Sequence, residues 1–215
     1  NLDADEKKIL DNMKKANINK SIIFPLPSIN IDLDEANEYT IKIANKYPDK
    51  FIPFTIIDDK PEYWLKKGAK GFKEHTFGLR IQKDAHGNDI FSQKYKKTYS
   101  FMEENRIPLL LHGGINKVER LKEDILKDTP QLLVILAHLG ADYMGKNQIT
   151  NISQVTKLLK ELDEFNNIYY DISAIVDNRI LYKAIEIVGV NKLIFGSDYP
   201  FETPAKTLKR FNALK

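Results

Sequence analysis

The chain of 215 residues is long enough for one domain of fair size with a continuous hydrophobic core. Its composition, 42% hydrophobic and 29% charged, is ordinary for a globular protein and excludes a disordered or fibrous chain. The 33 basic and 30 acidic side chains leave a net charge of +3, which is too small and too dispersed to favour nucleic acid or an anionic membrane as a partner.

Short apolar, β-branched runs alternate along the chain with amphipathic helical stretches. The near-continuous apolar character of these runs is typical of parallel strands covered on both faces. We predict strands at Ser21–Leu26, Phe51–Ile57, Ala69–His75, Ile107–Gly113, Leu132–Leu139, Asn167–Ser173 and Lys192–Asp198. Apolar residues at helical spacing predict helices around Ile9–Ala16, Ala36–Tyr47, Val155–Leu162 after a Ser153 cap, and Leu181–Val188 before Gly189.

Strict strand–helix alternation indicates right-handed βαβ units and a parallel sheet. Seven strands favour a (β/α) barrel that lacks one member, or an open doubly wound sheet. The first strand is followed by Phe24-Pro25-Leu26-Pro27 rather than a glycine-rich phosphate loop, which weakens the case for a dinucleotide-binding sheet.

The chain has no cysteine and no long apolar segment. Disulfides, a zinc–thiolate site and a thiol nucleophile are therefore excluded. The longest apolar run, Leu132 to Ala137, is far too short to cross a bilayer, and no signal peptide is visible. We expect a cytoplasmic protein with no membrane partner, and the sequence leaves room for a homo-oligomer.

Three of the four histidines and one aspartate lie at or near the carboxyl ends of predicted strands: His75, His112, His138 and Asp198. In a parallel barrel these ends converge on one face, where catalytic groups collect. Imidazole and carboxylate are also the natural ligands of zinc and similar divalent ions. Each residue has a simpler explanation, a hydrogen-bonded packing histidine or a turn-forming aspartate, but the joint pattern favours a metal or catalytic site.

Lys73 shares strand parity with His75, and we expect both to point inward. Lys73 could form a Schiff base, bridge a metal after carboxylation, or contact a substrate carboxylate; it could equally be solvated beside Glu74. Arg80 lies in the long connection from Thr76 to Ser92 and could meet an anionic substrate, although a surface position is the safer expectation.

Asp171 and Ser173 share a face at the end of the sixth predicted strand and could orient a ligand histidine. Capping of the next helix is the role we expect for them. Arg179, just past the sixth predicted strand, could also meet an anionic substrate, although a surface position is the safer expectation. His86 is expected in an exposed turn.

Five segments together resemble the amidohydrolase-related (amidohydrolase 2) family of metal-dependent TIM-barrel enzymes, which includes hydrolases, lactonases and decarboxylases. They are Gly68–His75, Ile107–Gly114, Leu136–Gly140, Ile168–Ser173 and the Gly-Ser-Asp-Tyr-Pro segment within Leu193–Phe201. The resemblance runs from about Asp5 to Lys215. It implies a (β/α)8 TIM barrel with a single domain over residues 1–215.

The resemblance also implies roles for individual residues. His112 and Asp198 become metal ligands, and Asp198 also shuttles a proton. His138 becomes a ligand to a second metal, or the group that polarises water or substrate. Lys73 and His75 match a strand-end Lys-x-His that faces the substrate. The implied cofactor is a divalent metal, zinc first among the candidates, and the substrate is a small molecule, with a carboxylate suggested by the nearby positive charges.

One departure from the family is clear. Its first strand carries a His-x-His pair of metal ligands, and no such pair occurs in this sequence. We therefore expect the first strand and the end of the last helix to be absent from this chain, and its metal site to be incomplete, with removal preferred over evolutionary loss because a barrel missing a strand exposes two edges.

The leading hypothesis is a metal-dependent hydrolase that activates water, or polarises a carboxylate substrate for decarboxylation. Two alternatives stay open: a Schiff-base, aldolase-type barrel using Lys73, and a catalytically silent barrel kept as a binding or structural unit. A metal-dependent nuclease on a related barrel lacks the clustered basic surface that would grip phosphates.

Overall fold

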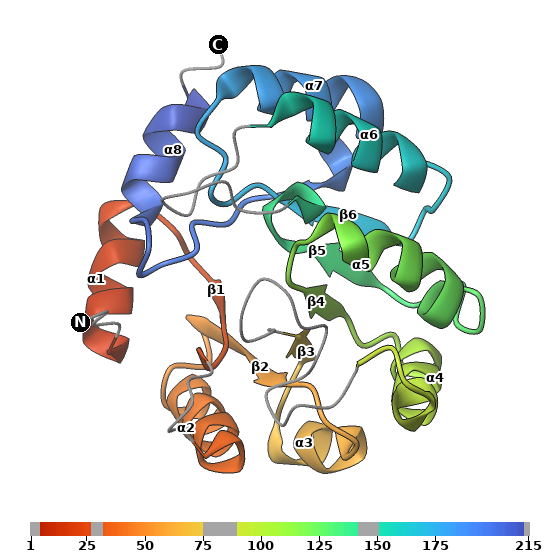
Figure 1. Ribbon diagram of the computed structural model, residues 1–215. Coiled ribbons are helices and arrows are strands. Elements are labelled where there is room, and N and C mark those ends of the chain that lie inside the picture. The colour runs from red at the N-terminus through yellow and green to blue at the C-terminus, as the bar shows by residue number, and fades with distance from the viewer. Residues whose placement is uncertain (1–4, 27–31, 75–89, 142–150, 213–215) are drawn as a thin grey trace. The chain divides into compact units, whose positions relative to one another are not determined.

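The computed structural model describes residues 5–26, 32–74, 90–141 and 151–212, in which strands and helices alternate (Figure 1). The strands are β1 (Ser21–Ile23), β2 (Phe51–Ile56), β3 (Gly71–Glu74), β4 (Leu109–Leu111), β5 (Val134–Leu136), β6 (Ile168–Asp171) and β7 (Leu193–Ile194). The α-helices are α1 (Glu6–Lys15), α2 (Leu33–Lys46), α3 (Pro61–Lys67), α4 (Lys96–Glu104), α5 (Ile115–Arg120), α6 (Ile152–Leu162), α7 (Asn178–Val188) and α8 (Pro204–Asn212). All seven predicted strands are confirmed, each shorter than its apolar run.

The strands follow one another in the sheet in chain order, from β1 to β7. The pairs β1–β2, β2–β3, β3–β4 and β6–β7 are all parallel. A doubly wound sheet would reverse its strand order at a switch point, whereas consecutive order with helical crossovers is the topology of a (β/α) barrel. The fold is thus a partial TIM barrel, and the doubly wound alternative is wrong.

The contacts within the chain divide it into two compact units. The central unit comprises Lys20–His112 and Asn116–Ile135; the terminal unit comprises Asn1–Asn19, Gly113–Ile115 and Leu136–Lys215. The single domain over residues 1–215 stays a prediction.

In the central unit, close packing of β2, β3 and β4 fixes the strand register. Phe54 lies opposite Gly71 in the β2–β3 pair, and a Cβ atom on Gly71 would lie only 2.4 Å from the Phe54 ring. Glycine is therefore required for the Phe54 ring to cover the start of β3. Further along, Phe72 pairs with Leu109 of β4, and both side chains are fully buried.

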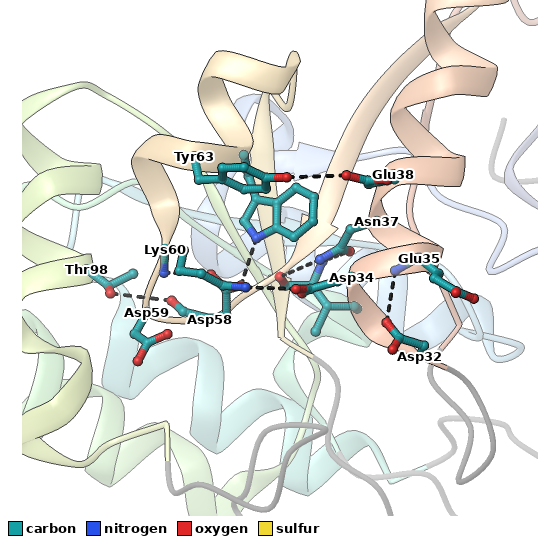
Figure 2. Close-up of polar contacts among 12 residues, drawn as sticks. Asp32, Asp34, Glu35, Asn37, Glu38, Asp58, Asp59, Lys60, Tyr63 and Thr98 are labelled. Atoms are coloured by element: carbon teal, nitrogen blue, oxygen red, sulfur yellow. Dashed lines mark hydrogen bonds and ion pairs between the residues drawn. The ribbon is translucent and has the colours of Figure 1, made fainter.

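Two buried polar side chains hold the end of β2 (Figure 2). Asn37 of α2 accepts a hydrogen bond from Ile56 N at 2.8 Å, and its amide nitrogen donates to Ile56 O at 3.4 Å. Asp58 accepts from Trp64 Nε1 and from Lys60 N, both at 2.8 Å, and so secures the turn into α3. Burial raises the pKa of Asp58, and these hydrogen bonds offset only part of that effect.

In the terminal unit, polar caps set the helix boundaries. Asp5 caps α1 and Asn151 caps α6. The Asn151 side chain accepts a hydrogen bond from Gln154 N at 3.0 Å. The predicted Ser153 cap is therefore wrong, because Asn151 satisfies the first turn and Ser153 lies inside the helix. The predicted end of α7 at Gly189 is confirmed; this residue has φ 78°, which glycine adopts without strain.

Within the described ranges, no helix is long and apolar enough to cross a membrane.

Candidate active site

His138 lies directly after β5 in a short 3-10 turn, η3 (Ala137–Gly140), and its side chain is buried. His138 and Leu139 have φ values of 57° and 56°, so two consecutive non-glycine residues are left-handed. Such a conformation costs about 1–3 kcal/mol per residue and persists only where surrounding packing over-determines it. Leu139 is fully buried, which helps to hold the turn. The histidine is consequently presented by strained but fixed backbone.

A chain of hydrogen bonds orients the His138 ring. Its Nδ1 lies 2.9 Å from Ser173 Oγ, and the Ser173 hydroxyl donates to Asp171 Oδ1. The same carboxylate oxygen accepts from Ser173 N at 2.6 Å. Because the hydroxyl hydrogen is directed to Asp171, Ser173 Oγ can only accept from His138. In the neutral imidazole the proton therefore belongs on Nδ1, and Nε2 is then the nitrogen with the lone pair.

These contacts bear on the two roles predicted for Asp171 and Ser173. We expected them to cap the following helix, but the N-cap of α7 is Asp177, whose side chain accepts from Arg179 N at 2.9 Å. The capping prediction is wrong, and the alternative, orientation of a histidine, is what the contacts show. Arg179 is an exposed surface residue, as predicted, and the structure also pairs it with Asp177.

Gly196, just after β7, provides the space for the Asp171 carboxylate. A Cβ atom on Gly196 would lie 2.1 Å from Asp171 Oδ2 and 2.7 Å from its carboxyl carbon. Any side chain at this position would displace the carboxylate. Close approach of the Asp171 carboxylate thus requires the glycine of the Gly-Ser-Asp-Tyr-Pro segment. The sequence contains this glycine but does not show that Asp171 is its neighbour.

Asp198 follows in the same segment, part-buried and with a left-handed φ of 54°. Its carbonyl oxygen accepts from Phe201 N at 2.9 Å, so the predicted turn is present. A turn and a functional carboxylate are compatible here.

Close approach also requires the first of the two glycines after His112, Gly113. A Cβ atom on Gly113 would lie 2.5 Å from the carbonyl oxygen of Ala141 and 2.9 Å from that of Ala137. Gly114 N donates to Gly140 O at 3.0 Å. Gly113 and Gly114 therefore lie directly against the turn that carries His138.

In the central unit, β3 ends in two buried charged residues, Lys73 and Glu74. Lys73 Nζ donates to Glu74 O at 2.6 Å and lies 5.7 Å from the centre of the Phe24 ring. The Glu74 carboxylate accepts from the backbone N–H of His112 at 3.1 Å. The alternative of a solvated Lys73 is wrong, because only 2% of Lys73 is exposed.

The predicted site residues are thus placed in three groups. His138 and Asp198 lie in the terminal unit, and Lys73 and His112 in the central unit, where Glu74 contacts both. His75 and Arg80, together with His86, fall outside the described residues. Sequence reasoning missed Glu74, which it treated only as a neighbour of Lys73.

Residues 29–215 match the model of the Amidohydrolase family. The chain belongs to this family. No curated protein matches the chain.

Several solved structures share the fold of this amidohydrolase-family chain. A 2,6-dihydroxybenzoate decarboxylase from Rhizobium is 17% identical with a TM-score of 0.75, over 100% of this chain and 83% of the other. A 5-carboxyvanillate decarboxylase from Sphingomonas paucimobilis is 14% identical with a TM-score of 0.70, over 98% and 78%. An amidohydrolase from Burkholderia multivorans with bound zinc is 13% identical with a TM-score of 0.76, over 99% and 81%. At these identities the likeness supports the fold alone.

A divalent metal fits the donor chemistry of this amidohydrolase-family chain. A ligand histidine almost always donates its second ring N–H to a fixed partner, as His138 does to Ser173. Among the residues that the structure describes, no three His, Cys, Asp or Glu side chains form a metal-binding group. In the described part of the chain, His138 is thus oriented by its hydrogen bonds without being part of a completed ligand cluster.

Proposed function

We propose that this protein is a metal-dependent hydrolase of the amidohydrolase family. The observation that carries the proposal is the Asp171–Ser173–His138 hydrogen-bond chain, which presents Nε2 of a buried histidine at the carboxyl end of a barrel strand. In this fold the carboxyl ends of the strands are where catalysis takes place. Packing alone would not require a part-buried carboxylate and a strained backbone to fix one imidazole.

In this proposal His112, His138 and Asp198 hold the metal, for which zinc is our first candidate. When bound, the metal lowers the pKa of water and stabilises negative charge on the oxygen of the substrate. Asp198 accepts a proton from the attacking water and delivers it to the leaving group. His138, held by Ser173, keeps Nε2 directed at the reacting centre without rotating, so no reorganisation is needed during the reaction.

Lys73, His75 and Arg80 are the proposed substrate-binding residues, and a carboxylate is the proposed substrate feature. The ammonium of Lys73 is buried at the end of β3, where its charge is only weakly screened by water. An anionic group that reached this strand end would be attracted by that charge. The names of two structural neighbours, a dihydroxybenzoate and a carboxyvanillate enzyme, support a small carboxylate.

Decarboxylation is the second candidate reaction, because both of these neighbours are named as decarboxylases. It would use the same residues differently. The residues proposed to hold the metal would, together with it, bind the substrate carboxylate and an adjacent oxygen. A proton would then replace the departing carbon dioxide. In hydrolysis, by contrast, a water oxygen is incorporated into the product.

The test is an assay of the zinc-loaded, full-length protein with a panel of carboxylate-bearing lactones and hydroxybenzoates. Hydrolysis incorporates oxygen-18 from labelled water, whereas decarboxylation releases carbon dioxide without incorporation into the product. Loss of turnover in His138→Ala, with retained folding, supports the proposed role of His138. Full activity in His138→Ala would refute it, and borohydride trapping of Lys73 with substrate would favour the Schiff-base alternative.

A further inference from the structure

The last rung between β3 and β4 departs from the regular pattern of a parallel ladder. The register pairs Phe72 with Leu109 and Glu74 with Leu111, and Phe72 N donates to Pro108 O at 3.0 Å. Two residues further on, regular pairing would direct the N–H of His112 to the carbonyl oxygen of Glu74.

Side-chain groups replace the two backbone partners at this position. The carbonyl oxygen of Glu74 accepts from Lys73 Nζ at 2.6 Å, and the His112 N–H donates to the carboxylate of Glu74 at 3.1 Å. Glu74 is fully buried and Lys73 is 2% exposed. The side-chain carboxylate of Glu74 therefore accepts the hydrogen bond that its own backbone carbonyl would accept in a regular sheet. Burying a charged group in this way costs free energy.

We propose that Glu74 is a positioning residue for His112, which sets the direction in which the His112 peptide leaves the sheet and so aims its imidazole. This inference rests on the proposed function, in which His112 is a metal ligand. A carboxylate forms a stronger hydrogen bond with an N–H than a neutral carbonyl does, and it reaches further from its own backbone. The peptide of His112 is consequently held at a position that the regular ladder would not give.

The same unit contains a matched control. Asn37, 1% exposed, accepts from Ile56 N at 2.8 Å at the end of β2. Like Glu74, it is a buried side chain that supplies an acceptor to a strand-end N–H. It holds no proposed metal ligand, so its loss should affect stability alone.

The experiment measures zinc affinity, by competition with a chromophoric chelator, and thermal midpoints for the full-length protein and its variants. Glu74→Met removes the acceptor but fills the space, and Glu74→Gln keeps an acceptor oxygen. Asn37→Leu removes the control acceptor at similar volume. We expect zinc binding to weaken by about tenfold or more in Glu74→Met, to change by less than about threefold in Glu74→Gln, and to be unchanged in Asn37→Leu.

The outcomes separate this inference from the proposed function. If the unsubstituted protein binds no zinc, the proposed function fails and this inference fails with it. If it binds zinc and Glu74→Met binds equally well, or if Asn37→Leu weakens binding as much, the positioning role alone is overturned. Should Glu74→Met not fold, Glu74→Asp keeps the charge but shortens the side chain by one methylene; unchanged zinc affinity in that variant overturns the positioning role.

Discussion

Replacing Gly196 with alanine tests the orientation of His138 from the far end of its hydrogen-bond chain. The new Cβ would lie 2.1 Å from Asp171 Oδ2, and real Cβ contacts essentially never fall below 3.0 Å, so the carboxylate must move by about 0.9 Å. Overpacking of this kind costs about 1–3 kcal/mol. Losing hydrogen bonds to a charged group adds about 1.5–3 kcal/mol. We expect Gly196→Ala to lower the free energy of unfolding by about 3 kcal/mol, below the sum because the carboxylate can regain hydrogen bonds with water.

A double-mutant cycle with Asp171→Ala measures whether the effect of Gly196→Ala depends on the Asp171 carboxylate. Removing the carboxylate removes the clash, so the double variant should be about as stable as Asp171→Ala alone, with a coupling of at least about 1 kcal/mol. The assay is urea unfolding of the four proteins. Additive effects, or a Gly196→Ala variant within about 0.5 kcal/mol of the parent protein, would show that Gly196 does not support Asp171.

Three further predictions follow from other contacts. Ser173→Ala should reduce metal affinity and turnover by about 10–100-fold while the protein stays folded, because His138 loses its hydrogen bond to Ser173. Metal affinity measured by calorimetry and turnover measured by kinetic assay that both equal those of the parent protein would contradict this. Burial raises the pKa of Asp58, so its favourable contribution to the free energy of unfolding exists at low pH and is lost as the pH rises through its folded pKa. Relative to the parent protein, Asp58→Asn should therefore gain stability between pH 3 and pH 7. A stability difference that does not change with pH would count against this. Burial also raises the pKa of Glu202, but hydrogen bonds from Arg210, Thr207 and Lys206 outweigh it and lower the pKa to about 2; Glu202→Gln should destabilise the protein above the ordinary value of 4.5 and have progressively less effect toward pH 2 in unfolding titrations.

The strands were predictable because buried parallel strands leave continuous apolar runs, but their ends were not. The run that contains β5 continues through Ala137, His138 and Leu139, which look like strand in the sequence. In the structure these residues lie in a short turn in which His138 and Leu139 are left-handed. Apolar composition reports burial, and the turn is as buried as the strand, so hydropathy could not separate them.

The site was predictable as a set of residue types at strand ends, and its internal contacts were not. Ser173 and His138 are 35 residues apart, and strand parity indicated only that Asp171 and Ser173 share a face. Their partner depends on which strands are neighbours and on where the turn after β5 directs His138. Glu74 was missed for a related reason: its partner is a backbone N–H, which every sequence position offers equally.

Zinc content of the full-length protein is the decisive measurement for the proposed metal-dependent hydrolase. Elemental analysis of the purified, zinc-reconstituted protein and of its His112→Ala, His138→Ala and Asp198→Ala variants measures bound metal per chain. Our account predicts about one or two zinc ions per chain in the parent protein and a marked loss in the variants, each still folded by circular dichroism. A folded parent protein without stoichiometric zinc, or variants that retain it fully, would contradict the metal-dependent hydrolase.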